Sequence, residues 1–307
     1  MTHSIISIYR RFPTHADCIA HLEAVRWRGQ ARCPICFETN VTGHQEAGRR
    51  NRWQCLKCQR SFSVTAGTIF HNSHVDLQRW FLLISLMLSA KKGLSAMQAA
   101  RDLEMRRPTV WSMMHRVRAA MKSDGGLLTG LVEMDETFVG GKPRKANRKD
   151  DRPEGGNKAT RGHGTKKTPV LGMIERGGKV KAKMAMEGDL SQAKLADFVR
   201  ANLDCSKSVL HTDEYGGYNG LNTFVFHRRI NHSQEYSKRD LFTGQFGNVH
   251  TNTIEGFWAI MKRAIYGQFH HVSKKYMDLY VNELTWRFNN RKNEEMFNEV
   301  LVCAVQP

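Results

Sequence analysis

The chain has 307 residues, 40% of them hydrophobic, and its 47 Lys and Arg outnumber 29 Asp and Glu, giving a formal net charge of +18. This length suits two or three domains, and the charge indicates a polyanionic partner, because each cation that neutralises a phosphate releases condensed counterions. Binding to an anionic membrane is the alternative explanation of this charge. Since there is no apolar run of about 18 residues and no signal-peptide segment, we expect a cytoplasmic protein, nucleoid-associated in a bacterial host.

The first distinctive feature is a pair of C-x2-C motifs separated by 18 residues. A two-residue gap lets both thiolates of a motif reach one ion, and a second motif completes a closed tetrahedral site. The sequence therefore predicts one structural Zn²⁺ in a zinc ribbon within residues 1–70, after a short N-terminal helical segment. Strands are expected at 50–54 and 61–64. The predicted zinc ligands are Cys33, Cys36, Cys55 and Cys58.

Three further cysteines, Cys18, Cys205 and Cys303, are scattered along the chain. An odd total argues against a disulfide framework. The alternative, that the paired cysteines are redox-active or incidental, does not account for the matched spacing. We therefore expect the scattered cysteines to take no part in metal binding.

Residues 71–126 read as helices with a tight turn. Helical spacing of apolar residues predicts helices at 75–90, 96–103 and 108–121, with Ser95 as an N-cap and Pro108 in a first turn, where its missing N–H is not needed. A short helix, a turn and a basic second helix form the layout of a helix-turn-helix, whose second helix enters the major groove. An ordinary three-helix unit with a solvated basic face is the alternative. The basic residues of the second helix and its approach are Arg106, Arg107, His115, Arg116 and Arg118.

Residues 127–307 follow the order of an α/β domain with a mixed sheet. The predicted order is three strands, a helix, a strand, a helix-like segment and a fifth strand, which is the order of a ribonuclease-H-like fold. A basic, Gly-rich tract at 140–168 is too polar for a core and reads as a flexible insertion. The expected strands are 131–139, 169–174, 180–186, 208–213 and 223–226, and the expected helices are 191–203, 253–265, 276–289 and 294–302.

Two carboxylates occupy informative positions in this domain. Asp135 lies within the first strand and Asp213 ends the fourth, so both are expected side by side at an edge of the sheet. Pleat alternation places Glu133 on the face of Asp135 and Glu136 on the opposite face. Acids grouped in this way suit a pair of divalent ions about 3.5–4 Å apart, which activate a nucleophile and stabilise the leaving oxygen in phosphodiester chemistry. A turn-forming role for Asp213 is the alternative.

Four segments carry a resemblance to a known family. Residues 133–141 (EMDETFVGG), 211–213 (HTD), 230–233 (INHS) and 250–258 (HTNTIEGFW) resemble bacterial insertion-sequence transposases with an ISXO-like DDE domain. That family also has an N-terminal zinc ribbon and a helix-turn-helix, so the resemblance covers nearly the whole chain. It implies a ribonuclease-H-like catalytic domain that uses two Mg²⁺ (or Mn²⁺) ions.

The resemblance also implies roles for individual residues. Asp135, Asp213 and Glu255 are the implied catalytic acids and metal ligands, and Lys262, with Arg263 beside it, is the implied contact to the DNA terminus. Asn252 is the alternative third ligand, since some members carry Asn in this role. Asn252 and Glu255 also fit a helix-capping box.

The roles of three further residues near these motifs remain open. Trp258 reads as a core residue rather than one that stacks on a base. His232 and His250 could support the metal ligands or lie on the surface.

The predicted function is a DNA transposase that binds the ends of an insertion sequence and performs metal-dependent strand cleavage and transfer. Its partners would be the terminal inverted repeats and target DNA, and it would act as a homo-oligomer, at least a dimer on DNA. A transcription regulator has no use for the three acids, and a nuclease such as a Holliday-junction resolvase has less use for the N-terminal modules. An inactive or domesticated DNA-binding derivative remains open.

Overall fold

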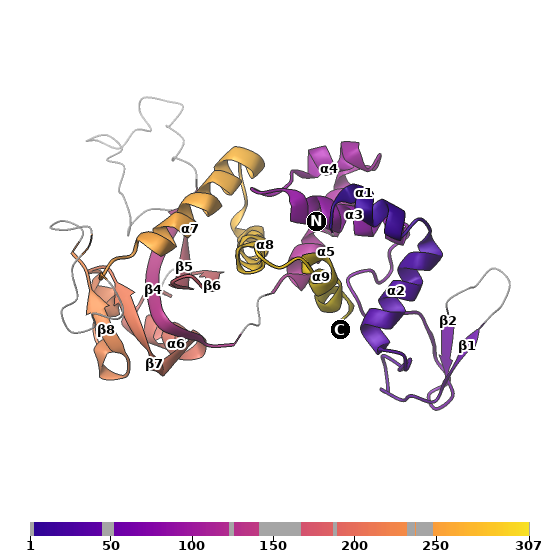
Figure 1. The fold of residues 1–307 in the computed structure, drawn as a ribbon, viewed down its shortest axis with the longest axis horizontal. Helices are drawn as coiled ribbons and strands as arrows, with labels where there is room; N and C mark the ends of the chain where they lie inside the picture. The colour runs from indigo at the N-terminus through magenta and orange to yellow at the C-terminus, as the bar shows by residue number, and fades with distance from the viewer. Residues whose placement is uncertain are drawn as a thin grey trace, which may run out of the picture. The chain divides into compact units, whose positions relative to one another are not determined.

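The chain forms two compact units, labelled by element in Figure 1: residues 1–122 with 290–307, and residues 123–289. The computed structural model describes residues 3–44, 52–122, 126–140, 167–186, 189–231, 237 and 248–306. The predicted 140–168 insertion lies almost entirely outside these ranges, as do Arg50 and His232. Within the described residues, every helix is too short or too polar to cross a lipid bilayer.

The first unit begins with two helices and a small antiparallel sheet. Helices α1 (Ile5–Arg11) and α2 (His15–Trp27) precede strands β1 (Val41–His44), β2 (Arg52–Cys55) and β3 (Ser61–Phe62), paired in the order β1-β2-β3. Strands β2 and β3 agree with the expected ribbon strands, whereas β1 is additional. The indole of Trp53 lies edge-on to Trp27 at 5.5 Å and donates a 2.8 Å hydrogen bond to Glu23, which fixes the sheet to α2.

The rest of the first unit is helical: α3 (Leu77–Ser89), α4 (Ala96–Asp102), α5 (Arg107–Ala120) and α9 (Met296–Val305). The side chain of Ser95 accepts a hydrogen bond from the backbone of Gln98, which confirms it as the N-cap of α4. Glu104 adopts a left-handed φ of 51° in the turn between α4 and α5. The predicted short helix, turn and second helix are therefore present.

Helix α9 belongs to the first unit, which differs from the expected domain of residues 127–307. The ring of Phe297 lies 5.5 Å from Phe81 and 6.2 Å from Phe12, and the carbonyl of Ala304 accepts a hydrogen bond from Ile69. Periodicity in the sequence predicts a helix here but does not identify the unit against which its apolar face packs.

The second unit is built on a five-stranded mixed sheet. Its strands are β4 (Leu128–Val139), β5 (Thr168–Glu175), β6 (Val180–Met184), β7 (Leu203–Thr212) and β8 (Phe226–Arg229). Their order is β6-β5-β4-β7-β8; β5 is antiparallel to both neighbours, and β4, β7 and β8 are parallel. This order and direction fit a ribonuclease-H-like sheet, as the sequence predicts.

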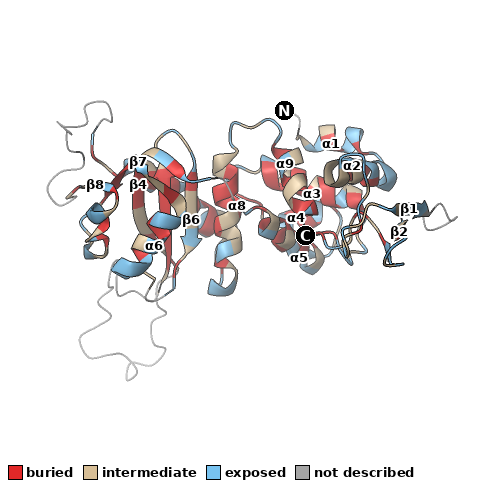
Figure 2. Ribbon diagram, turned by 90° about the horizontal axis from the view of Figure 1, so that it is seen from below, coloured by how far each residue is buried: buried red, intermediate tan, exposed pale blue. Residues whose placement is uncertain are grey.

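Each face of the sheet is covered by helices, and buried residues gather on its central strands (Figure 2). Helix α6 (Gln192–Asn202) packs on one face, where Met134 and Leu171 point. Helices α7 (Asn252–Arg263) and α8 (Met277–Asn289) pack with Val139, Val170 and Ile174 of the other face. The alternation along β4 therefore assigns Glu133 and Asp135 to the α7 face and Glu136 to the α6 face.

Polar side chains of α8 cover the edge strand β6. Asp278 accepts a hydrogen bond from the backbone N–H of Met184, and the amide of Asn289 bonds both the N–H and the carbonyl of Val180. Unpaired edge groups invite pairing with another chain. Side chains of α8 therefore form hydrogen bonds with the edge backbone groups at both ends of β6.

The last strand lies later in the chain than expected. Residues Leu221–Thr223 form a 3-10 turn (η2) introduced by Gly220 at φ 85°, and β8 begins at Phe226 rather than at 223. The strand is set by its pairing to β7, in which Val209 faces Phe226 and Thr212 faces Arg229. The sequence of β8, FHRR, lacks the apolar pattern typical of a strand, so the position of this strand is difficult to predict.

Candidate functional site

Three carboxylates converge where β4 runs beyond the end of β7. One oxygen each of Asp135, Glu136 and Asp213 lies within 4.8 Å of the others. The β4–β7 pairing ends at Glu133 opposite His211, and Asp213 follows the last residue of β7. The predicted proximity of Asp135 and Asp213 is confirmed.

The expectation that Glu136 points away from this group is wrong. Glu136 does start on the α6 face, but pleat alternation separates two side chains only where a neighbouring strand continues between them. At Asp135 and Glu136 the β7 side of β4 is no longer paired. A long side chain can therefore approach Asp213 around the open edge.

Trp258 of α7 holds the carboxylate of Asp135. Its indole N–H donates a 3.0 Å hydrogen bond to Oδ2 of Asp135, and its ring is 3% exposed. The ring lies against β5 at Gly172, the cross-strand partner of Asp135, where a Cβ would stand 2.6 Å from the indole. Trp258 is therefore a core residue, as expected, and it also orients the first acid.

Burial and like charge act together on Asp135. Burial, then the charges of Glu136 and Asp213, raise the pKa of Asp135 from 3.8 to about 8. Carboxylates this close cannot all ionise cheaply without a compensating cation. The group therefore has the electrostatic character of a cation site.

Asp213 makes a turn and also joins the acid group. Its Oδ1 accepts a 3.0 Å hydrogen bond from the backbone N–H of Tyr215, which is an Asx turn. The guanidinium of Arg229 donates to the carbonyls of Glu214 and Tyr215. Asp213 therefore forms the turn and also lies within the acid group, and the loop that carries it is fixed to β8.

A second, fully buried acid fixes the N-terminus of α7. Oε2 of Glu133 accepts hydrogen bonds from the backbone N–H groups of Thr253 (2.8 Å) and Ile254 (3.1 Å), and Oε1 accepts from the Thr253 hydroxyl at 2.9 Å. An acid at a helix N-terminus pairs with unsatisfied donors and with the positive end of the helix dipole. Glu133 thereby caps α7 from the sheet.

Arg176 completes this buried network. Its Nε lies 2.6 Å from Oε1 of Glu133, and its remaining nitrogens contact the carbonyls of Asn248 and His250 and Nδ1 of His211. His250 lies 3.1 Å from Glu133, so it supports this network rather than lying free on the surface. No local pattern in the sequence indicates this arrangement, since its members are far apart in the chain.

The two candidates for the third ligand lie at the start of α7. Asn252 and Glu255 are both exposed, and Glu255 is not part of the 4.8 Å acid group. The capping-box interpretation of this pair is wrong, because the N-cap is Thr251, whose hydroxyl lies 3.2 Å from Oε1 of Glu255. Lys262, half-buried, and Arg263, exposed, lie in the last turn of the same helix.

The acid group fits hard divalent cations. Oxygens that share one Mg²⁺ at about 2.1 Å lie at most about 4.2 Å apart, close to the span within this group. Among the described residues, Asp135, Glu136 and Asp213 form the one acidic cluster with this spacing. These residues could hold a metal ion, with Glu255 a short distance along the chain from Trp258.

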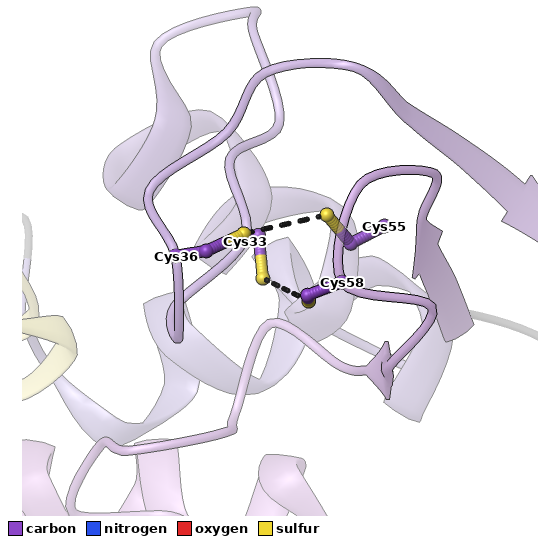
Figure 3. A group of neighbouring side chains, drawn as sticks. All are labelled: Cys33, Cys36, Cys55 and Cys58. Carbon is purple, nitrogen blue, oxygen red and sulfur yellow. Dashed lines mark hydrogen bonds between the residues drawn. The ribbon is translucent and has the colours of Figure 1, made fainter.

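The four predicted zinc ligands also converge (Figure 3). The sulfurs of Cys33 and Cys58 are 3.7 Å apart, and those of Cys36 and Cys55 are 3.5 Å apart. Tetrahedral bonds of about 2.3 Å to one Zn²⁺ separate sulfurs by about 3.8 Å, so the donor set fits zinc.

The two cysteine motifs share the same backbone conformation. The residue after each second cysteine, Phe37 or Gln59, has a left-handed φ of 60° or 57° and donates its N–H to the first cysteine's carbonyl. The three other cysteines lie elsewhere: Cys18 in α2, Cys205 in β7 and Cys303 in α9.

The basic residues of the predicted second helix divide into two groups. Arg106 and Arg107 are exposed at the start of α5, and Trp111, which follows in the same helix, is also exposed. Arg116 donates instead to the carbonyls of Ile69 and His71 and so has a structural partner. Arg106 and Arg107 therefore lie exposed to solvent, whereas Arg116 is bonded within the first unit.

His115 and Arg118 are buried, at 9% and 1% exposure. Their burial is difficult to predict from helical periodicity, because each side chain combines an apolar part with a polar end.

The family model and two relatives all point to proteins of transposable elements. The model of the ISXO2-like transposase domain matches residues 127–289. The chain is 28% identical over 253 residues to an uncharacterized protein in transposable element ISH50 of Halobacterium salinarum, a match that covers 79% of this chain and 80% of that protein. It is 29% identical over 113 residues to an uncharacterized transposase-like protein of Haemophilus influenzae, covering 36% of this chain and 84% of that protein.

Solved structures give more distant matches. The Mos1 transposase paired-end complex with left transposon end matches at 15% identity and a TM-score of 0.26, covering 72% of this chain and 77% of that chain. The Mos1 strand transfer complex matches at 14% identity and a TM-score of 0.21, covering 65% and 76%.

Proposed function

Because the chain belongs to the family of ISXO2-like transposase domains, we propose that it is a DNA transposase that binds the ends of an insertion sequence and catalyses metal-dependent strand cleavage and strand transfer. The observation that carries this proposal is the acid group at the open edge of β4, in which Asp135 and Asp213 come together from strands 78 residues apart in sequence. A purely DNA-binding regulator needs no such group.

The acids serve the chemistry of a phosphodiester. A pair of divalent ions, when bound, activates a water or a 3′-hydroxyl and stabilises charge on the leaving oxygen. Asp135 and Asp213 are the proposed ligands from the sheet, and Glu255 is the proposed third acid from α7. Trp258 fixes the rotamer of Asp135, and the Glu133 cap fixes the helix that carries Glu255.

DNA recognition is assigned to the first unit and to the end of α7. Arg106 and Arg107 stand exposed at the start of α5, the end of a recognition helix that contacts base edges. Lys262 and Arg263 extend from the helix of Glu255 and are proposed to contact the DNA terminus. The net charge of +18 supports phosphate binding along a longer duplex.

The proposed cofactors are two Mg²⁺ or Mn²⁺ ions at the acid group and one Zn²⁺ at the four cysteines. The donor sets support this division, because hard divalent ions prefer carboxylate oxygens and zinc accepts thiolates. The proposed partners are the element's terminal inverted repeats and target DNA, and we propose a homo-oligomer on DNA, since two ends must be processed together.

The test separates binding from chemistry. Purified protein is assayed with labelled element ends in Mg²⁺, in parallel with Asp135→Asn, Asp213→Asn and an Arg106→Ala/Arg107→Ala double variant. The Asp variants should lose cleavage by about a thousandfold or more while binding ends as tightly as the wild type. The Arg double variant should lose preference for the end over random duplex.

The products identify the reaction class. Joining of the cleaved end to a second DNA supports a transposase, and cleavage without joining indicates a nuclease. If both Asp variants cleave normally, the enzyme assignment is overturned. If the wild type binds ends specifically but never cleaves them, the chain is a DNA-binding derivative.

A further inference from the structure

Glu136 has two partners that its strand position does not predict. It belongs to the 4.8 Å group with Asp135 and Asp213, although it starts from the opposite face of β4. It also accepts, at Oε2, a 2.5 Å hydrogen bond from the hydroxyl of Tyr218. Glu136 is therefore bonded by Tyr218 and also lies within reach of the two aspartates at the open edge of β4.

Tyr218 is built to hold that carboxylate. Its side chain is 0% exposed, and burial followed by the charges of Glu136 and Asp135 raises the pKa of Tyr218 well above its usual 10. The hydroxyl therefore stays protonated and donates. Tyr218 lies in the turn η1 (Gly216–Tyr218), five residues after Asp213, and is packed against Tyr215 at 5.7 Å. One short segment thus contains both Asp213 and Tyr218, the residue that orients the carboxylate of Glu136.

Gly217 lets this segment pack closely. A Cβ at Gly217 would meet Leu195 of α6 at 2.8 Å and the backbone oxygen of Leu190 at 3.0 Å. The path from Asp213 to Tyr218 is therefore set by close packing. This packing fixes the position of Tyr218 and, through its hydrogen bond, that of the Glu136 carboxylate.

We propose that Glu136 is a third carboxylate ligand of the acid group, and that Asp135, Glu136 and Asp213 bind one divalent cation without Glu255. This inference rests on the proposed function, because it concerns the same metal site. Three carboxylates this close repel one another when ionised, and a divalent cation offsets their charge. Glu255 then serves the second ion or the DNA-bound state.

The experiment measures Mn²⁺ binding to the full chain by electron paramagnetic resonance, without DNA. The variants are Glu136→Gln, Asp135→Asn and Glu255→Gln, with Glu214→Gln as the matched control, since Glu214 is an exposed neighbour outside the group. We expect Glu136→Gln and Asp135→Asn to weaken Mn²⁺ by about tenfold or more. Glu214→Gln and Glu255→Gln should leave the tightest Mn²⁺ site within about twofold of the wild type.

Tyr218→Phe tests how Glu136 is held. Removing the hydroxyl should weaken Mn²⁺ by about threefold or more, and the loss should vanish when Glu136 is already Gln, because the two residues act through one contact. A purely structural Tyr218 gives equal losses in both backgrounds. Thermal unfolding in EDTA checks that each variant is folded.

Each result decides between the two proposals. If Asp135→Asn loses Mn²⁺ and Glu136→Gln does not, Glu136 is only a partner of Tyr218 and the inference is overturned while the metal site stands. If Glu255→Gln weakens the tightest site as much as Asp135→Asn, the cation needs α7 and the inference is again overturned. If no variant changes Mn²⁺ binding, the proposed metal site itself is wrong.

Discussion

Oε2 of Glu133 lies 2.8 Å from the backbone nitrogen of Thr253, so a strand residue caps a helix that begins 119 positions later in the sequence. Replacing Glu133 with Gln puts an amide among donors and leaves Arg176 without its buried counter-charge. Breaking such a pair costs about 3–5 kcal/mol of unfolding free energy. Urea denaturation measures the loss. Glu175→Gln, on the neighbouring strand, is the control and should change stability by less than about 1 kcal/mol.

Two glycines should respond in opposite directions to alanine. Gly172→Ala drives a Cβ to 2.6 Å from the Trp258 indole, so it should destabilise by about 1–3 kcal/mol and lower cleavage by moving the partner of Asp135. Gly256, within α7, has nothing within 4 Å of its Cβ position. Gly256→Ala should therefore stabilise by up to about 1 kcal/mol. Equal effects of both changes in thermal unfolding would contradict the close packing of Trp258 on β5.

The third ligand can be assigned by comparing two residues of α7. Glu255→Gln should reduce cleavage of an element end in Mg²⁺ by about a thousandfold or more, with end binding retained. Asn252→Ala should change activity modestly and stability by less than about 0.5 kcal/mol, because Asn252 is exposed and is not the N-cap. The reverse pattern, an active Glu255→Gln and an inactive Asn252→Ala, assigns the role to Asn252.

The four-cysteine site should contain about one zinc per chain. Cys33→Ser should remove the metal and unfold the small sheet β1–β3, because so small a segment depends on its ion. Cys205→Ser is the matched control, since Cys205 lies in β7, outside the group. Elemental analysis of the purified proteins gives the result, and unchanged zinc in Cys33→Ser rules the site out.

Stability without metal should fall as the pH rises. The pKa of Asp135 is raised to about 8, above its unfolded value near 3.8, so between these values the folded state holds a proton that the unfolded state has lost. Asp135→Asn should abolish this dependence and, at pH 8 in EDTA, stabilise the protein by about 1 kcal/mol or more, roughly 2–4 °C in Tm. Adding Mg²⁺ at pH 8 should raise the Tm of the wild type and leave that of Asp135→Asn unchanged. A flat profile for the wild type in EDTA contradicts the shift.

Local pattern predicts much of this fold. Cysteine spacing identifies the four convergent sulfurs, and the order of strands and helices predicts a mixed sheet that brings Asp135 and Asp213 together. These features succeed because each depends on residues close in sequence or on one topological rule. The catalytic roles of the acids remain predictions.

Features that depend on strand ends and distant partners escape the sequence. Glu136 is misjudged because alternation assumes that β7 extends as far as β4. The Glu133–Arg176 pair joins residues 43 positions apart, and nothing local marks it as buried. The capping box fails by one residue, since Thr251 and not Asn252 precedes the first turn of α7.

Helix α9 completes the core of the first unit, although it follows the second unit in sequence. A ribosome delivers residues 1–122 first, then all of residues 123–289, and only afterwards the helix that packs on Phe81 and Phe12. Domains that fold during synthesis generally do so from the N-terminus. Here that order is inverted: the unit with the proposed recognition helix can complete its core only after residues 123–289, the proposed catalytic unit, have been translated.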